Sequence, residues 1–176
     1  MHVSDLGLIQ VYTGTGKGKT TAALGLAMRA CGHGLRAYMV QFMKGRIDYG
    51  ELKVAEKIEG LTIEQFGRPD FVDKDNPAEE DIELAREALA KSKEVVLSGE
   101  YDLVILDEIN VAIEWNLIDV GEVVDLLEMK PKDVEVVLTG RYARQEIIDL
   151  ADLVSEVKEV KHPFTRGMHS RVGVDY

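Results

Sequence analysis

The chain has 176 residues, 45% of them hydrophobic and 30% charged, which is enough for one buried core and too few for two ordinary domains. Its 21 basic and 32 acidic residues give a formal net charge of -11, which should repel nucleic acid. The single cysteine, Cys31, excludes an intrachain disulfide or a cysteine zinc site. No run approaches the roughly 18 apolar residues of a membrane span. We therefore expect one cytoplasmic domain covering residues 1–176, with no membrane or nucleic-acid partner.

Short apolar runs alternate with helical patterns along the whole chain, which predicts consecutive βα units. Most of these runs are continuously apolar, as expected for strands that are covered on both faces of a parallel sheet. The predicted strands are Leu8–Tyr12, Arg36–Phe42, Leu61–Phe66, Tyr101–Asp107, Val134–Thr139 and Leu153–Val160. The chain should therefore have an α/β fold built on a mainly parallel sheet of six strands.

Helices are predicted between these strands. The first begins at Lys19 and has a face of small apolar residues at helical spacing, with Gly32 placed where a C-terminal cap belongs. Asn76 and Pro77 are the N-cap and first-turn residues expected for the second. The predicted helices are Lys19–Cys31, Pro77 to about Ser98, Val120–Glu128 and Arg144–Leu150. The segment Gly67–Asp75 has no periodicity and should be a loop.

A glycine-rich run, Gly14–Thr21, follows a predicted strand and opens a predicted helix, as a phosphate-binding P-loop requires. Lys19 would reach the phosphates of a nucleoside triphosphate and the Thr20 hydroxyl would bind Mg²⁺. Thr13 stands where this motif usually has its first glycine, and Lys17 is either a phosphate ligand or a solvated loop lysine. The candidate ATP-binding residues are Thr13, Gly14, Thr15, Gly16, Lys17, Gly18, Lys19, Thr20, Thr21 and Arg141.

Two later strands end in residues that suit the same site. Asp107 and Glu108 end a hydrophobic strand, where P-loop proteins keep a carboxylate near the metal. The sequence leaves open which of the two meets Mg²⁺, because adjacent residues on a strand point to opposite faces. Arg141 follows the next strand, and its guanidinium suits a polyphosphate unless it is only a surface residue on a turn. Together these features predict a P-loop NTPase-like (RecA-like) three-layer sandwich.

The ordered motifs of the chain resemble the P-loop family of cob(I)alamin (corrinoid) adenosyltransferases over nearly its whole length. No single short motif accounts for the resemblance, which rests on the order of the motifs along the chain. The motifs are the loop from Thr13, Gly32-His33-Gly34, Val40-Gln41-Phe42-Met43-Lys44-Gly45, Gly50-Glu51, Asp107-Glu108, Thr139-Gly140-Arg141, Ala151-Asp152-Leu153-Val154, Lys161-His162-Pro163-Phe164, Gly167 and Gly173-Val174-Asp175-Tyr176.

The resemblance implies transfer of the 5′-deoxyadenosyl group of ATP to the Co(I) of a reduced corrinoid, with release of triphosphate. The corrinoid is itself the nucleophile, so the protein supplies position and charge. Lys19, Arg141, Mg²⁺ and the loop amides would stabilise the departing triphosphate, and Glu108 and Asp107 would position the metal or a water molecule. Phe71 would lie beneath the corrin ring and help to remove its lower axial ligand, although Asp73 stands where the family has a tryptophan. A homodimer, a reductase that supplies Co(I) and a corrinoid-dependent acceptor enzyme are also implied.

Two other functions are compatible with the same loop. A small-molecule kinase would need a lid rich in arginine and a site for the phosphate acceptor, and a nucleotide-gated corrinoid-binding module would hold the corrinoid without turnover. Phe71 could also be an ordinary anchor of its loop on the core. Gln41, Lys44 and Glu51 could shape the nucleotide or corrin pocket.

Overall fold

The computed structural model of the chain describes residues 6–46 and 48–175. Its six strands form one sheet in the order β3-β2-β4-β5-β1-β6, and every neighbouring pair is parallel. The strands are β1 (Ile9–Thr13), β2 (Ala37–Phe42), β3 (Leu61–Phe66), β4 (Leu103–Asp107), β5 (Glu135–Thr139) and β6 (Leu153–Glu156). The predicted α/β class and parallel sheet are confirmed.

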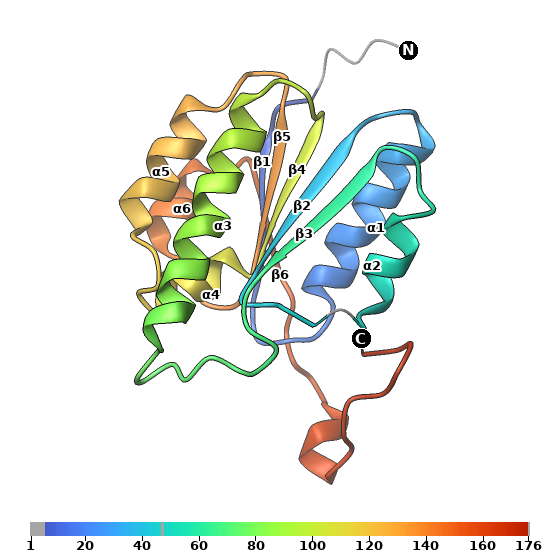
Figure 1. Cartoon of the computed structure of the whole chain (residues 1–176), viewed down its shortest axis with the longest axis vertical. Coiled ribbons are helices and arrows are strands. Elements are labelled where there is room, and N and C mark those ends of the chain that lie inside the picture. Colours follow the sequence, from blue (N-terminus) through green and yellow to red (C-terminus); the bar gives the residue numbers. More distant parts are fainter. Residues whose placement is uncertain (1–5, 47, 176) are drawn as a thin grey trace.

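Helices cover both faces of this sheet and give the three layers seen in Figure 1. One face carries α1 (Lys19–Gly32) and α2 (Gly50–Ala55). The other carries α3 (Glu79–Leu97), α4 (Ile109–Glu114), α5 (Val120–Met129) and α6 (Gln145–Leu150). A short 3-10 helix, η1 (Pro163–Arg166), lies in the C-terminal segment, away from the sheet.

Strand residues alternate between two hydrophobic cores, because successive side chains of a strand point to opposite faces. On β2, Tyr38 and Val40 belong to the core beneath α3, whereas Met39 packs against α1. The alanine face of α1, Ala23, Ala27 and Ala30, lets that helix lie close to the central strands. This packing explains why the predicted strands are continuously apolar.

Most predicted boundaries agree with the structure within two residues, and the exceptions are the end of the last strand and the caps of the first two predicted helices. The last strand ends at Glu156 instead of Val160, because the following residues leave the sheet edge and contact the phosphate loop. Gly32 lies inside α1, and the chain turns at His33 and Gly34, whose N–H groups bond Ala30 and Cys31 carbonyls. The helices α2 and α4 are short and were not predicted.

The start of α3 also differs from its prediction. Its N-cap is Ala78, and Asn76 and Pro77 lie outside the helix. The N–H of Ala78 donates to the carboxylate of Asp81, 3.0 Å away, and Arg68 donates two further hydrogen bonds to that carboxylate at 2.7 and 2.8 Å. A buried carboxylate in the first turn therefore stabilises this helix end and anchors the loop that precedes it.

We expect Asp81→Asn to lower the free energy of unfolding, because it removes a buried carboxylate that accepts two hydrogen bonds from Arg68. The hydrogen bonds from Arg68 lower the pKa of the Asp81 carboxyl. A carboxyl with a lowered pKa stabilises the fold above its unfolded-state pKa of about 3.9, and this contribution disappears as the pH falls through its folded-state pKa. Urea unfolding at pH 7 and pH 3 checks this expectation. An equal difference between the variant and the unaltered chain at both pH values would contradict it.

Among the described helices, none is long and apolar enough to span a membrane. Residues 1–5 and Tyr176, the last residue of the C-terminal motif, lie outside the described part of the chain.

Candidate nucleotide site

The phosphate loop, Gly14–Thr21, joins β1 to α1 at the carboxyl edge of the sheet. Gly14 has a positive φ of 96°, and a Cβ there would lie 2.5 Å from the Val157 carbonyl oxygen. The N–H of Gly16 donates to the same carbonyl at 2.7 Å. Glycine is thus required at position 14 by both backbone conformation and the close approach of the segment after β6.

The side chain of Lys19 folds back onto this loop. It donates hydrogen bonds to the carbonyl oxygens of Gly14 and Gly16, at 2.8 and 2.7 Å, and only 7% of the residue is exposed. Burial lowers the pKa of Lys19, although the carboxylates of Glu108 and Asp107 partly oppose this. A cation is therefore held inside the curve of the loop, where phosphate oxygens bind in proteins of this kind.

Asp107 is the centre of a buried hydrogen-bond network at the end of β4. One carboxylate oxygen accepts from the hydroxyls of Thr20 and Thr139, at 2.8 and 2.7 Å. The other accepts from the amide of Gln41 at 3.2 Å and from the ammonium of Lys44 at 2.6 Å. Asp107 therefore orients the hydroxyl of Thr20, which is the group that the sequence assigns to the metal.

Glu108 differs from Asp107 in conformation and exposure. Its backbone is left-handed, with φ 64°, and its N–H donates to the Thr139 hydroxyl at 2.9 Å. The strand ends at this turn, so the two carboxylates need not point to opposite faces of the sheet. Burial and the neighbouring Asp107 raise the pKa of the Glu108 carboxyl, while Lys44, Lys19 and Arg141 lower it. The carboxyl of Glu108 thus belongs to the same charged cluster.

Arg141 lies in the exposed turn between β5 and α6. Its charge acts on both Lys19 and Glu108, lowering the pKa of each. Thr13, at the position of the missing first glycine, accepts a hydrogen bond from the N–H of Ala143 at 3.3 Å. The Thr13 side chain therefore ties the start of the phosphate loop to the turn that carries the arginine.

The C-terminal segment contacts the phosphate loop through an ion pair and a hydrogen bond. The ammonium of Lys17 forms an ion pair of 2.6 Å with Asp175, and the N–H of Glu159 donates to the Thr15 hydroxyl at 3.4 Å. Lys17 and Arg171 lower the pKa of the Asp175 carboxyl through hydrogen bonds. In this structure the half-exposed side chain of Lys17 is thus paired with Asp175.

Phe71 is fully exposed in the loop that follows β3, with a relative accessibility of 101%. Its neighbour Val72 packs against the main core instead. Phe71 is therefore not the residue that anchors this loop. The loop leaves the same edge of the sheet as the phosphate loop, as Figure 1 shows.

Several contacts of the site were not predicted from the sequence. The sequence presents Thr139 only as the start of a motif, yet its hydroxyl joins Asp107 to the backbone of Glu108. For Lys44 and Gln41 the sequence predicts a place near the nucleotide or the corrin but no partner. A polar residue at or close to the end of a buried parallel strand is the signal that points to all three, because such ends meet at one edge.

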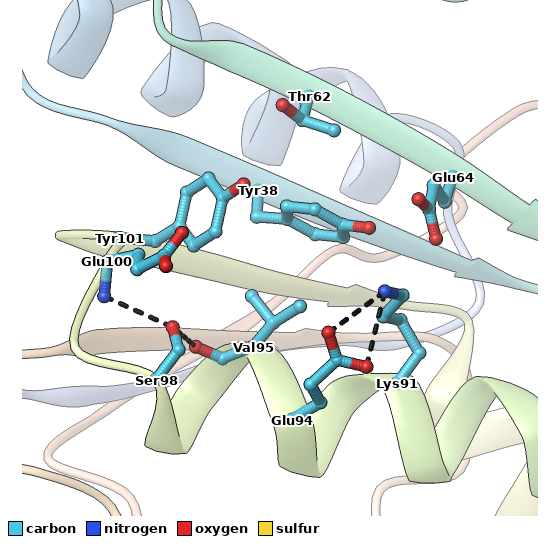
Figure 2. A pocket seen from close by; sticks show the side chains of 9 residues that line it. All are labelled: Tyr38, Thr62, Glu64, Lys91, Glu94, Val95, Ser98, Glu100 and Tyr101. Atoms are coloured by element: carbon cyan, nitrogen blue, oxygen red, sulfur yellow. Dashed lines mark hydrogen bonds and ion pairs between the residues drawn. The ribbon is translucent and has the colours of Figure 1, made fainter.

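A separate cavity of about 250 Å³ lies between α3 and the strands β2 and β3, toward the amino ends of the strands. Figure 2 shows Tyr38, Tyr101 and Glu64 on one side of it and Lys91 and Glu94 on the helix side. None of the predicted site residues lines this cavity. The predicted nucleotide-binding residues thus lie away from this cavity.

The fold and the site together define a P-loop nucleotide-binding protein. A parallel sheet, a glycine-rich loop that opens α1, and a carboxylate bonded to the Thr20 hydroxyl occur in the spatial relation that this class requires.

The chain belongs to the ATP:corrinoid adenosyltransferase family BtuR/CobO/CobP, which matches residues 5–176. It is 41% identical over 174 residues to a corrinoid adenosyltransferase of Sinorhizobium sp, covering 98% of this chain and 81% of that relative. It is 38% identical to the corrinoid adenosyltransferase of Escherichia coli strain K12 and 37% identical to the corrinoid adenosyltransferase CobA of Salmonella typhimurium. Both matches cover 98% of this chain and 87% of the relative.

Proposed function

We infer that the protein is an ATP:corrinoid adenosyltransferase, which transfers the 5′-deoxyadenosyl group of ATP to the cobalt of a reduced corrinoid. Membership of this family over residues 5–176 is the observation that carries the inference. In the reaction the Co(I) electron pair forms a bond to the 5′ carbon of ATP, the bond from that carbon to oxygen breaks, and triphosphate leaves. We also propose that the whole chain acts as one domain, since all six strands share one sheet.

The residues of the loop support this chemistry without a protein nucleophile. We propose that Lys19, Arg141 and the amides of Gly14–Thr21 neutralise the negative charge that grows on the departing triphosphate. The same groups would serve a kinase, but the two reactions differ in what the loop holds. In the transferase the loop binds the group that departs, whereas in a kinase it binds the group that is transferred.

Mg²⁺ fits the oxygen donors of the site. The Thr20 hydroxyl and the carboxylates of Glu108 and Asp107 are the hard ligands that this ion prefers, and substrate phosphates normally complete its coordination. The described residues hold no cluster of three or more His, Cys, Asp or Glu side chains, so the phosphates would have to contribute. We propose that Glu108 binds the ion and that Asp107, fully buried and already hydrogen bonded, orients Thr20. The bound ion would supply positive charge to the leaving triphosphate.

A direct assay tests the proposed reaction. The purified protein is incubated with ATP, Mg²⁺ and chemically reduced cobalamin, and the products are followed by absorbance and by chromatography. Adenosylcobalamin, which is sensitive to light, and one equivalent of triphosphate should form. ADP with a phosphorylated acceptor would instead identify a kinase, and corrinoid binding without turnover would identify a binding module.

We propose that Phe71 contacts the corrin, because this fully exposed phenylalanine has no packing role and its loop leaves the same edge of the sheet as the phosphate loop (Figure 1). Phe71→Ala should slow the reaction from Co(II) under a mild reductant by about tenfold, which corresponds to the loss of one good aromatic contact. Reaction from pre-formed Co(I) should change much less. Phe71→Trp keeps an aromatic face and should retain the rate, and equal losses in both assays would refute the role.

The identity of the electron donor, the acceptor enzyme and the oligomeric state stay predictions from the resemblance. We propose a reductase that supplies Co(I), a corrinoid-dependent enzyme that accepts the product, and a cytoplasmic homodimer. Light scattering of the purified protein would test the last of these.

A further inference from the structure

Lys44 lies in the turn after β2 and reaches the centre of the proposed metal site. Its ammonium is 2.6 Å from one carboxylate oxygen of Asp107, and its side chain is 17% exposed. The other oxygen of Asp107 accepts from the Thr20 hydroxyl at 2.8 Å. A positive charge of the protein is thus bonded directly to the carboxylate that orients the proposed magnesium ligand.

The backbone holds Lys44 firmly in this place. Met43 has a left-handed φ of 56°, and its N–H donates to the Phe66 carbonyl oxygen at 2.8 Å. A Cβ on Gly67 would lie 2.4 Å from the backbone nitrogen of Lys44, so the turns after β2 and β3 touch. A residue in a sparsely populated conformation persists only where its surroundings determine it, which is common at functional sites.

The second lysine of the site does not take the same role. Lys19 donates to two carbonyl oxygens of the phosphate loop, whereas Lys44 donates to Asp107. The carboxylates of Glu108 and Glu51 also act on Lys44 and favour its charged form. Lys44 is therefore the lysine that pairs directly with Asp107, while the charges of Lys19 and Arg141 also act on this acidic cluster.

We propose that Lys44 keeps a free divalent cation from binding at Asp107 and Glu108, so that the metal enters only together with the nucleotide. Like charges a few ångströms apart repel strongly at a partly buried site. A triphosphate adds several negative charges to the cluster, which then accommodates both the metal and the ammonium. The affinities for metal and nucleotide are then coupled, so binding of either one raises the affinity of the protein for the other.

This inference rests on the proposed function only in taking a nucleoside triphosphate as the ligand of the phosphate loop. The coupling involves binding alone and needs no corrinoid. It can therefore be tested with ATP in the absence of corrinoid, where no adenosyl transfer occurs.

The experiment measures Mn²⁺ binding by electron paramagnetic resonance, with and without ATP, for the unaltered protein and for Lys44→Met. The unaltered protein should bind Mn²⁺ weakly without ATP and much more tightly with it. Lys44→Met should bind Mn²⁺ alone at least about tenfold more tightly, because the competing charge is gone. Lys53→Met removes an exposed lysine of α2 and should leave Mn²⁺ binding unchanged.

Two further variants keep the test decisive if Lys44→Met folds poorly. Lys44→Arg retains the positive charge and should still exclude Mn²⁺ in the absence of ATP. The double variant Lys44→Met with Asp107→Asn removes both partners and should fold without gaining Mn²⁺ affinity. Tight binding of Mn²⁺ alone to the unaltered protein, or equal affinities of Lys44→Met and Lys53→Met, would overturn the proposal whether or not the protein transfers adenosyl groups.

Discussion

Lys19→Ala should reduce the rate of adenosyl transfer by about 100- to 1,000-fold, the usual effect of removing one group that stabilises charge in a transition state. The ammonium of Lys19 lies inside the phosphate loop and contacts only its carbonyl oxygens among the hydrogen-bond partners described. Its loss therefore removes positive charge from the place where negative charge develops. The measurement is the initial rate of adenosylcobalamin formation from pre-formed Co(I).

Lys17→Ala is the matched control for this prediction. Lys17 belongs to the same loop and carries the same charge, but its ammonium pairs with Asp175 at 2.6 Å. We expect Lys17→Ala to lower the rate by about tenfold or less, since an exposed ion pair contributes little. Thermal unfolding should show that both variants fold. Similar losses for the two variants, or an unchanged rate for Lys19→Ala, would contradict the assignment.

Asp107→Asn should lower both the stability of the protein and its affinity for ATP in the presence of Mg²⁺. The substitution leaves the Lys44 ammonium without its buried partner, which should lower the free energy of unfolding by about 3 kcal/mol. It also weakens the hold on the Thr20 hydroxyl, so transfer should slow by about 100-fold or more. Calorimetric titration with Mg²⁺ and ATP measures the affinity, and urea unfolding measures the stability.

Asp81→Asn separates the two effects, because Asp81 is also a buried carboxylate paired with a cation but lies in another part of the fold. It should also reduce stability while leaving the affinity for Mg²⁺ and ATP unchanged. If both variants lost nucleotide affinity equally, the effect of Asp107→Asn would be a general consequence of instability.

The sequence analysis located the phosphate loop and the end of β4 because both signals are local. A strand, a run of glycines with Lys19 and Thr20, and a helix follow one another directly along the chain. The carboxyl ends of parallel strands meet at one edge, which allowed Asp107, Glu108 and Arg141 to be assigned to the same site. The structure brings all of these residues together around the loop.

Contacts between distant segments were not accessible in this way. Lys44 follows β2 and Asp107 ends the neighbouring strand β4, so their ion pair joins segments that are distant in the sequence. The sequence pattern around Lys44 does not indicate which carboxylate it contacts. The overlong prediction for the last strand has the same origin. Val157 and Val160 favour a strand, but the backbone carbonyl of Val157 accepts a hydrogen bond from Gly16 of the phosphate loop instead.

By itself the sequence determined the order of βα units and the phosphate loop, because periodicity and short motifs depend on neighbouring residues, and the order of its motifs indicated the family. Only the tertiary structure decided that Asp107 orients Thr20, that Lys17 pairs with Asp175, and that Phe71 is exposed while Val72 packs on the core. These outcomes depend on which side chains meet at the edge of the sheet. Folding brings groups from distant segments together, and those groups determine the partner of each charged side chain.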